Sequence, residues 1–318
     1  MRSKKILITG GMGYVGSIVC RYLYDKGYKI IIVDNLCRSS ISHSFYEEFY
    51  QIDLCDKKEL SKVFEKHKID KIVHLASNAY VQESVLFPDK YYNNNLISSI
   101  NLLDLMVQFK IKEIVFSSTC SIFDSTKNKI SEKSKINPVN PYAKSKYMIE
   151  QMIKDYSNSY KIKYLIFRFF NVGGADIANG LGENHEPETH LIPVLVQSCL
   201  SNKLFNIYGK DYNTSDGTCV RDYIHVHDLA RAIGLGLKNI NNEDYNLGSG
   251  LGYSVNGILN LVQKVCSKNI KWKINKRREG DPAKLIADSS KASKELNWTP
   301  EKTILNIIED TYKWEKMK

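Results

Sequence analysis

The chain has 318 residues, of which 43% are hydrophobic and 25% charged, and its formal net charge is +10. This length can bury a substantial core, and no apolar run approaches the roughly 20 residues needed to span a bilayer, so we do not predict a membrane protein. Only Ile6–Ile8 follows the basic start, which is too short for a signal peptide. We therefore expect a cytoplasmic protein.

The basic residues are spread along the whole chain, so we interpret most of the excess positive charge as solvated surface. A nucleotide diphosphate is an anion that suits this charge, whereas no motif combining basic and stacking residues indicates a nucleic acid. The seven cysteines include no CxxC pair, and the seven histidines form no HExxH motif. We therefore predict neither a disulfide framework nor a metal site.

The first half of the chain alternates short β-rich runs with amphipathic stretches. Strands are expected at Lys5–Thr9, Lys29–Val33, Tyr50–Ile52, Lys71–Leu75, Glu113–Ser117 and Lys163–Phe169. Helices are expected at Tyr14–Lys26, Lys57–His67, Asp89–Phe109 and Pro141–Ser157. This alternation predicts an α/β fold, a doubly wound Rossmann sheet of parallel strands that binds ligands at the carboxyl ends of its strands.

The composition changes after Asn171, where Val172 to Glu188 is predicted to be a loop. The later elements are expected at Ile192–Leu200 (helix), Phe205–Tyr208 and Arg221–Val226 (strands), His227–Lys238 (helix), Asp244–Leu247 (strand), and Val255–Ser267, Ser290–Leu296 and Thr303–Lys316 (helices). We predict a nucleotide-binding domain over residues 1–172, to which 218–248 returns. A smaller α/β substrate domain is expected over 173–217 and 249–318.

A glycine-rich turn, Gly10-Gly11-Met12-Gly13-Tyr14-Val15-Gly16, follows the first strand and opens a helix. Its glycines permit a tight turn close to a pyrophosphate, and the helix N-terminus attracts phosphate. Asp34 ends the second strand, where a carboxylate binds an adenosine ribose and repels a 2′-phosphate. NAD is therefore favoured over NADP, and Asp53 could bond the adenine amino group.

Tyr142 and Lys146 are four residues apart in a helix that starts at Pro141, so they share one helix face. A tyrosine pKa of about 10 is too high for a base at neutral pH, but a nearby ammonium and a nicotinamide cation favour the phenolate. Thr119 lies at the end of the strand expected at Glu113–Ser117, where its hydroxyl could meet the same substrate oxygen. These three side chains predict a site that oxidises an alcohol.

The motifs resemble those of the extended short-chain dehydrogenase/reductases and, within them, the UDP-hexose 4-epimerases. The resemblance covers nearly the whole chain. Its more specific stretches are Phe167–Asn171, His190–Pro193, Tyr208–Tyr212, Asp216–Val226 and Arg277–Ala283.

The resemblance implies that Tyr142 is the acid/base, that Lys146 positions the nicotinamide ribose and tunes Tyr142, and that Thr119 bonds the sugar 4-oxygen. NAD would contact Gly10, Gly13, Tyr14, Val15, Gly16, Asp34, Asn35, Asp53, Leu54, Leu75, Ala76 and Asn94. The UDP-sugar would contact Asn171, His190, Leu191, Asn206, Tyr208, Arg221, Arg278, Asp281 and Leu285. An arginine suits this role because its fork binds phosphate in bidentate fashion.

The implied reaction is epimerisation at C4 of UDP-glucose or UDP-galactose through a 4-keto intermediate, with transient hydride transfer to tightly bound NAD. Related dehydratases carry Asp-Glu after the strand-end threonine, so Cys120 and Ser121 at these positions argue against dehydration. The family pattern also implies a homodimer formed through the helices Asp89–Phe109 and Pro141–Ser157.

Leu285 bears on the substrate, because in the family a bulky tyrosine near this position restricts the pocket to plain hexoses. The smaller leucine predicts that UDP-GlcNAc and UDP-GalNAc are also accepted. Two alternatives stay open, namely a 4-epimerase of another UDP-sugar, a pentose or uronate, and a non-catalytic NAD- or nucleotide-binding regulator. Ala79, Ser98 and Asp124 depart from the commonest family pattern without removing a catalytic group.

Overall fold

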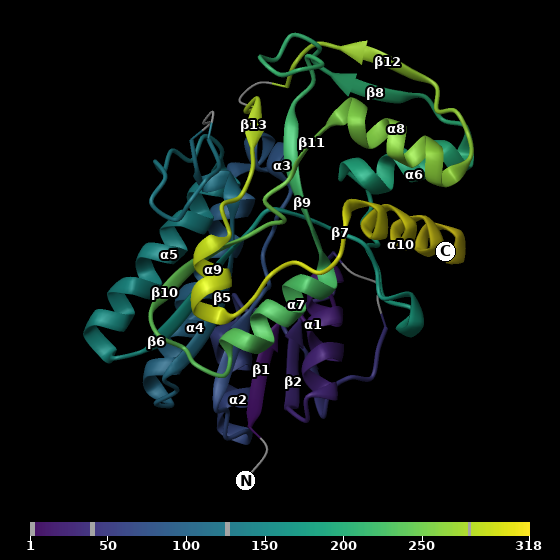
Figure 1. Ribbon diagram of the computed structural model, residues 1–318. Helices are drawn as coiled ribbons and strands as arrows, with labels where there is room; N and C mark the ends of the chain where they lie inside the picture. Colours follow the sequence, from purple (N-terminus) through teal and green to yellow (C-terminus); the bar gives the residue numbers. More distant parts are fainter. Residues whose placement is uncertain (1–3, 39–41, 125–127, 279–280) are drawn as a thin grey trace. The chain divides into compact units, whose positions relative to one another are not determined.

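The computed structural model describes residues 4–38, 42–124, 128–278 and 281–318, whose helices and strands are labelled in Figure 1. The chain divides into two compact units. The first unit contains residues 1–122, 137–168 and 230–245, and the second contains 123–136, 169–229 and 246–318. Of the segment 218–248, only residues 230–245 therefore belong to the first unit.

The first unit is built on a seven-stranded sheet with the order β10-β6-β5-β4-β1-β2-β3 (Figure 1). Its strands are β1 (Lys5–Thr9), β2 (Lys29–Asp34), β3 (Glu48–Gln51), β4 (Lys71–His74), β5 (Glu113–Thr119), β6 (Lys163–Phe169) and β10 (Glu243–Leu247). The central strand β1 pairs in parallel with β2 and β4, and Leu7 lies opposite Ile31 and Ile72. This sheet confirms the predicted doubly wound α/β fold.

Helices cover both faces of this sheet. They are α1 (Tyr14–Asp25), α2 (Lys57–Lys66), α3 (Val81–Leu86), α4 (Pro88–Gln108), α5 (Pro141–Tyr160) and α7 (Val226–Gly236), with the short η1 (Cys120–Ile122). Leu7 belongs to a core shared with α2, α4 and α5. Its neighbours Ile6 and Ile8 point to the opposite face because strand side chains alternate. On that face α7 packs closely, since Gly234 abuts Tyr22 of α1 and Gly236 abuts Phe167 of β6.

The second unit is organised around strand β9 (Val220–His225). This strand pairs in parallel with β7 (Asn171–Gly173) and β13 (Lys284–Leu285), and antiparallel with β11 (Gly252–Ser254). A separate parallel pair joins β8 (Phe205–Tyr208) to β12 (Trp272–Asn275). The helical elements are η2 (Ile177–Asn179), α6 (Leu191–Ser201), α8 (Val255–Cys266), α9 (Ser290–Leu296) and α10 (Ile304–Met317), and α6, α8 and α10 share one apolar core.

Local chemistry fixes the start of α5, the helix that carries Tyr142. The Asn140 side chain accepts a hydrogen bond from the Ala143 backbone N–H at 2.9 Å, and Pro141 occupies the first helical position. The helix ends at Tyr160, one turn later than predicted, and Lys161 follows with φ +58°. Tyr142 therefore lies in a well-capped first turn whose backbone is held in place.

Some expectations differ from the structure. The segment Val172–Glu188, predicted as a loop, contains β7 and η2, and the short helix α3 was not predicted. Across the described ranges, no helix combines the length and apolarity needed to cross a membrane. All seven cysteines lie within the described residues, and none of them is joined in a disulfide.

Candidate active site

The glycine turn after β1 has a backbone that tolerates no side chain at two positions. Gly10 has φ +71°, and a Cβ there would lie 2.7 Å from the Ala76 backbone nitrogen. A Cβ at Gly16 would clash with the Gly10 carbonyl oxygen. Gly13 then caps α1, which begins at Tyr14 and continues through Val15. The turn packs against Leu75 and Ala76 after β4, so these predicted cofactor residues meet at the carboxyl end of the sheet.

Two acidic residues lie at the carboxyl ends of neighbouring strands, Asp34 as the last residue of β2 and Asp53 two residues after β3. The Asp34 carboxylate accepts hydrogen bonds from the backbone N–H of Met12 at 3.0 Å and of Leu36 at 2.9 Å. Burial raises the pKa of Asp34 above its ordinary value. Asn35 donates to the Asp53 carboxylate at 3.0 Å, just before the buried Leu54. The Asp34 carboxylate is thus hydrogen-bonded to the glycine turn itself. This position fits a ribose ligand beside a pyrophosphate.

Tyr142 and Thr119 lie together at the end of β5. Their side chains share a hydrogen bond, which works to lower the Tyr142 pKa, but burial has the larger effect and raises that pKa to about 12. Burial, rather than the Lys146 charge, therefore determines the Tyr142 pKa in this structure. The phenol is held protonated with its oxygen beside the threonine hydroxyl, an arrangement in which both hydroxyls can address one substrate oxygen.

Lys146 lies one turn further along α5, and its side chain is hydrogen-bonded to the same strand, β5. Its Nζ donates to the Ser117 carbonyl oxygen at 2.8 Å and lies 4.8 Å from the centroid of the Phe116 ring. Burial lowers the Lys146 pKa to about 7, while the Glu150 charge works to raise it. The sequence prediction placed Lys146 on the face of Tyr142, and its ammonium is held by β5 in the structure.

A buried ion pair behind this lysine was not predicted. Glu150 accepts hydrogen bonds from Arg168 Nε at 3.0 Å and Nη2 at 2.7 Å, and from the Ser118 hydroxyl at 2.5 Å. Both charged side chains are at most 1% exposed. Arg168 also contacts Asp244, at 2.7 Å, and Asp244 in turn binds Lys154 at 2.9 Å. This network joins α5 to β5, β6 and β10.

Asn95 links the predicted cofactor residue Asn94 to α5, the helix of Tyr142 and Lys146. Its amide nitrogen donates to the Ser145 hydroxyl and to the Asn78 carbonyl, both at 3.1 Å. Its amide oxygen accepts from Asn94 at 3.0 Å. Ser145 lies between Tyr142 and Lys146 on α5, so Asn95 fixes the rotation of that helix. In the sequence, only the presence of an asparagine within a predicted helix could have pointed to Asn95.

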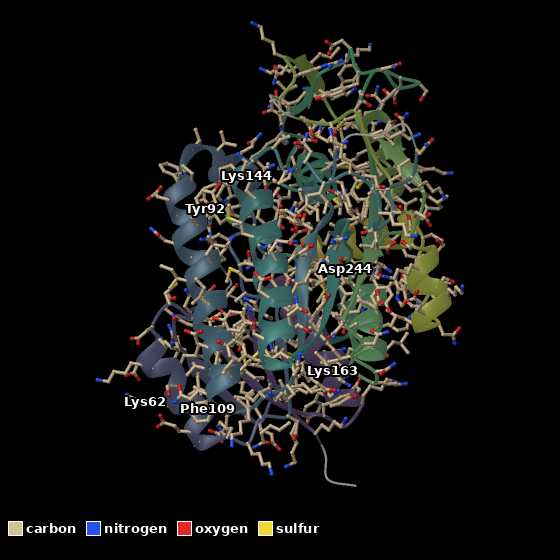
Figure 2. The ribbon with its side chains drawn as sticks, turned by 90° about the vertical axis from the view of Figure 1, so that its left-hand side faces the viewer. Lys62, Tyr92, Phe109, Lys144, Lys163 and Asp244 are labelled. Atoms are coloured by element: carbon tan, nitrogen blue, oxygen red, sulfur yellow. The ribbon has the colours of Figure 1, made fainter. Side chains whose placement is uncertain are left out.

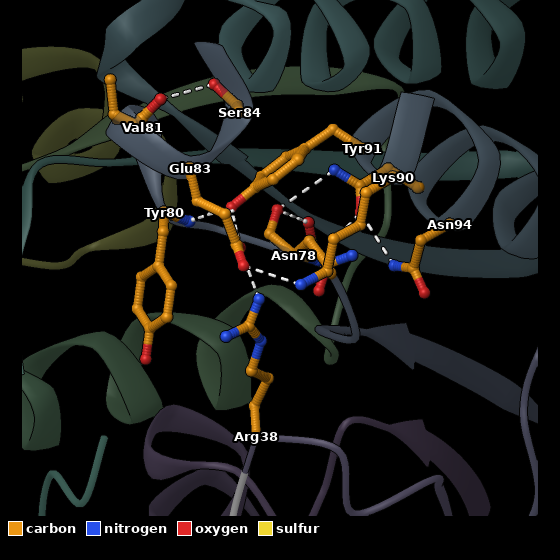
Figure 3. Close-up of polar contacts among 11 residues, drawn as sticks. Arg38, Asn78, Tyr80, Val81, Glu83, Ser84, Lys90, Tyr91 and Asn94 are labelled. Atoms are coloured by element: carbon orange, nitrogen blue, oxygen red, sulfur yellow. Dashed lines mark hydrogen bonds and ion pairs between the residues drawn. The ribbon is translucent and has the colours of Figure 1, made fainter. Parts of the chain in front are cut away.

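Glu83 joins the segment after β2 to the segment after β4, as Figure 3 shows. Its carboxylate accepts from Arg38, from Lys90 at 2.7 Å and from the Tyr91 hydroxyl at 2.8 Å. The Arg38 contact lowers the Glu83 pKa to about 2. The Tyr91 hydroxyl also accepts from the Tyr80 backbone N–H at 3.0 Å. The backbone between Ala76 and α4 is thereby tied to the segment that follows β2.

His74 on β4 supplies a pH-dependent contribution to stability. Its ring contacts the hydroxyls of Thr9 at 2.7 Å and Ser99 at 3.0 Å, while burial, and secondarily Lys146, lowers its pKa to about 3. Between this pKa and the ordinary value of 6.5, the unfolded chain binds a proton that the folded chain does not. Stability must therefore fall as the pH falls through this interval.

We expect His74→Gln to reduce this acid sensitivity. From roughly pH 7 to pH 5, the wild type should lose about 2 kcal/mol of unfolding free energy that the variant keeps. Urea denaturation at both pH values measures the difference between the two proteins. Parallel losses in the wild type and the variant would exclude His74 as the source.

Several predicted substrate residues meet on β9 and β13 in the second unit. Arg221 on β9 contacts the Asp281 carboxylate, and its guanidinium also donates to the Val220 carbonyl at 2.9 Å. Leu285 of β13 is buried and lies opposite Arg221 in the parallel register. The Arg278 guanidinium lies 4.2 Å from the centroid of the Tyr208 ring. The structure thus forms two arginine pairs, Arg221 with Asp281 and Arg278 with Tyr208.

Asn206 Oδ1 and the Tyr212 hydroxyl are among the buried polar atoms of this unit that lack a hydrogen-bond partner within the described residues. Asn206 belongs to the same strand as Tyr208, and Tyr212 stacks with Arg277, whose guanidinium lies 4.1 Å from the ring centroid. Unpaired buried polar atoms are costly and mark places where a polar ligand would be stabilised. The arginine guanidinium groups together with these unpaired polar atoms therefore fit an anionic, polar ligand such as a nucleotide diphosphate.

The other predicted substrate residues lie apart from the arginines in the chain. Asn171 on β7 donates to the Asp222 carbonyl at 2.8 Å. His190 caps α6, which begins at Leu191. The His190 ring contacts Glu183 of its own loop, and this carboxylate raises the His190 pKa to about 9. The structure records no contact of His190 with an arginine within the described residues.

A parallel sheet whose first turn is shaped for a pyrophosphate, with a Tyr–Lys helix at its carboxyl edge, defines a dinucleotide-binding α/β protein. The chain belongs to the NAD dependent epimerase/dehydratase family, whose family model matches residues 6–248. This membership confirms the predicted family resemblance and the predicted NAD cofactor.

Individual relatives are similar over nearly their whole length. The UDP-glucose 4-epimerase of Halalkalibacterium halodurans is 39% identical over 98% of this chain and 95% of the relative. The structure of the Bifidobacterium longum UDP-glucose 4-epimerase in complex with NAD⁺ and UDP is 35% identical, with a TM-score of 0.93 over 99% of both chains. The UDP-Glc/GlcNAc 4-epimerase from Campylobacter jejuni is 35% identical, with a TM-score of 0.83 over 99% of this chain and 100% of that one.

Proposed function

We propose that this protein is a UDP-glucose 4-epimerase, which interconverts UDP-glucose and UDP-galactose with the help of bound NAD. The observation that carries the proposal is the hydrogen bond between Tyr142 and Thr119, one helical turn from a lysine anchored on β5. Relatives that share the whole length of the chain carry the name UDP-glucose 4-epimerase. The sequence Thr119-Cys120-Ser121 lacks the acidic pair expected of a dehydratase.

The residues of the first unit supply the acid–base chemistry. Bound NAD supplies the hydride acceptor and donor that makes oxidation at C4 reversible. Gly10, Gly16 and Asp34 form the cradle for its pyrophosphate and ribose. Tyr142 removes the proton from the sugar 4-hydroxyl and returns it at the end, while Thr119 bonds the same oxygen. Lys146, one turn further along α5, would add the positive charge that favours the phenolate during the reaction.

The residues of the second unit would hold the UDP part of the substrate. Arg221 and Arg278 supply permanent charge for the two phosphates. Asp281 holds the Arg221 side chain in place, and Tyr208 holds that of Arg278. Asn206 offers a buried amide oxygen that a uracil N–H or a ribose hydroxyl would satisfy, and the buried Tyr212 hydroxyl could donate to a uracil or phosphate oxygen. Firm binding of the nucleotide allows the hexose to turn between two orientations, as epimerisation at C4 requires.

The proposal is tested by incubating the purified protein with UDP-galactose and following UDP-glucose by proton NMR. We expect conversion in both directions to one equilibrium mixture. Protein that carries NAD yet converts neither sugar would favour the alternative of a nucleotide-binding regulator. Conversion of a UDP-pentose or UDP-uronate alone would show instead a 4-epimerase of that other UDP-sugar.

Acceptance of N-acetylated sugars is a second proposal, which rests on Leu285. The side chain is 6% exposed and lies beside Arg221, where a tyrosine would need more space. The C. jejuni relative is named for both UDP-Glc and UDP-GlcNAc. We expect the same assay to convert UDP-GlcNAc to UDP-GalNAc, and no detectable turnover of this pair would refute the proposal.

A homodimer formed through α4 and α5 is a further part of this proposal. Figure 2 shows the two helices side by side, with Tyr92 and Lys144 at the same end. Both helices expose large apolar side chains, namely Ile97 and Ile100 on α4 and Met148 on α5. Light scattering that gives twice the mass of one chain would support a dimer, and a monomer mass would refute it. A cytoplasmic location stays a prediction from the sequence.

A further inference from the structure

The loop before α6 brings together four side chains that can bind a metal ion. Glu183, His185, Glu188 and His190 each offer one ligand atom, and these atoms all lie within 4.8 Å of one another. The four residues belong to the second unit and lie within eight positions of the sequence. They are the one such cluster of three or more histidine, cysteine or acidic residues among the residues that the structure describes.

The ligand atoms converge around the Glu183 carboxylate. Its Oε1 lies 3.0 Å from His185 Nδ1 and contacts His190 Nδ1. Glu188 Oε1 lies 3.9 Å from the same His190 nitrogen. A tetrahedral zinc site with bonds of 2.0–2.1 Å separates its ligand atoms by about 3.3 Å. The four groups are therefore close to the spacing that a bound ion would impose, with small side-chain adjustments.

Glu183 is paired with the His185 and His190 rings, whereas the buried Glu188 carboxylate is only partly compensated. The side chains of Glu183 and Glu188 are 3% and 4% exposed. Glu188 Oε1 accepts from the backbone N–H groups of Thr189 at 2.7 Å and His190 at 2.8 Å. Its Oε2 is buried without a hydrogen-bond partner among the described residues. A buried carboxylate oxygen in this state costs free energy that coordination to a cation would recover.

The backbone that carries these ligands is held by α10. Trp314 Nε1 donates to the Glu183 carbonyl oxygen at 2.6 Å. Gly182 lies so close to the Trp314 ring that a Cβ there would come within 2.5 Å of it. At the other end, His190 is the N-terminal cap of α6. Two fixed ends therefore set the position of the loop, which limits the loss of conformational entropy when an ion binds.

We infer that Glu183, His185, Glu188 and His190 form a site for a divalent transition-metal ion, with zinc as the expected occupant. Two imidazoles with two carboxylates suit zinc better than calcium or magnesium, which prefer all-oxygen ligands. Four protein ligands are typical of a structural site. The ion would fix the loop that leads into α6 and Leu191. The sequence prediction of no metal site considered only the CxxC and HExxH spacings, which this loop does not use.

The test measures zinc bound to the full chain after removal of any polyhistidine tag, which would itself bind metal. Wild type is loaded with zinc, dialysed against metal-free buffer and analysed by elemental mass spectrometry. We expect about one zinc per chain, as a single four-ligand site requires. The double variant His185→Gln/Glu188→Gln should bind zinc at least tenfold more weakly, since two of the four ligands are lost.

Glu186→Gln is the matched control, because Glu186 is an exposed glutamate in the same loop outside the cluster. It should retain zinc like the wild type. Equal zinc in the wild type and the double variant, or no retained zinc in the wild type, would overturn the proposal. If the double variant fails to fold, cobalt titration of the wild type decides. Visible bands of tetrahedral cobalt support the site, and their absence refutes it.

Discussion

Tyr142→Phe is expected to lower kcat for UDP-galactose epimerisation by roughly 10²- to 10⁴-fold, the range that a positioned general acid–base contributes. The variant keeps the aromatic ring in the first turn of α5 but removes the phenol oxygen that exchanges a proton with the sugar hydroxyl. The Thr119 hydroxyl remains, so substrate positioning is partly kept. Initial rates at saturating substrate measure the effect.

Tyr160→Phe is the control for this experiment, because it makes the same chemical change at the exposed far end of α5. It should leave kcat unchanged. NAD content should be equal in the wild type and both variants, which separates lost chemistry from a lost cofactor. An unchanged rate in Tyr142→Phe with NAD bound would exclude Tyr142 as the acid–base group.

Glu150→Gln is expected to lower the free energy of unfolding by about 3–5 kcal/mol, the cost of leaving one member of a buried ion pair without its partner. The variant keeps the shape of the side chain but leaves the Arg168 guanidinium, which is 1% exposed, without its main countercharge. Asp244 binds Arg168 as well, but it also forms an ion pair with Lys154 and is less buried than Glu150. Chemical denaturation followed by circular dichroism measures the loss.

A double variant distinguishes lost charge compensation from general disruption of the core. Arg168→Met added to Glu150→Gln removes the stranded charge, so the double variant should be more stable than Glu150→Gln alone. Asp244 keeps Lys154 as a partner at 2.9 Å in that background. Glu59→Gln, which breaks an exposed pair with Lys62, should leave the denaturation midpoint unchanged. A double variant less stable than both Glu150→Gln alone and Arg168→Met alone would contradict this explanation.

The sheet and the catalytic helix could be predicted because their signals are local. Short β-rich runs marked the strands β1, β2, β4, β5 and β6, and the glycine spacing marked the turn after β1. Pro141 marked the start of α5, and the spacing of Tyr142 and Lys146 gave their common face. Each of these features depends on neighbours within a few positions of the chain.

The residues that support the site depend on distant partners, which a single sequence does not reveal. Glu150 meets Arg168 across 18 positions, and Asn95 meets Ser145 across 50. Each of these residue types is common on protein surfaces, so its burial was unexpected. The strands β7, β11 and β13 have two or three residues, which is too short for an alternating pattern to appear. The metal-binding cluster also lacks any spacing known from common motifs.

In the proposed reaction, bound NAD would carry the C4 hydrogen between the two faces of the sugar, while Tyr142 would exchange the hydroxyl proton. Epimerisation of UDP-galactose in heavy water, followed by NMR, tests this claim most directly. We predict that UDP-glucose forms with its original hydrogen at C4, because that hydrogen never exchanges with solvent. Deuterium at C4, or no epimer at all, would contradict the account.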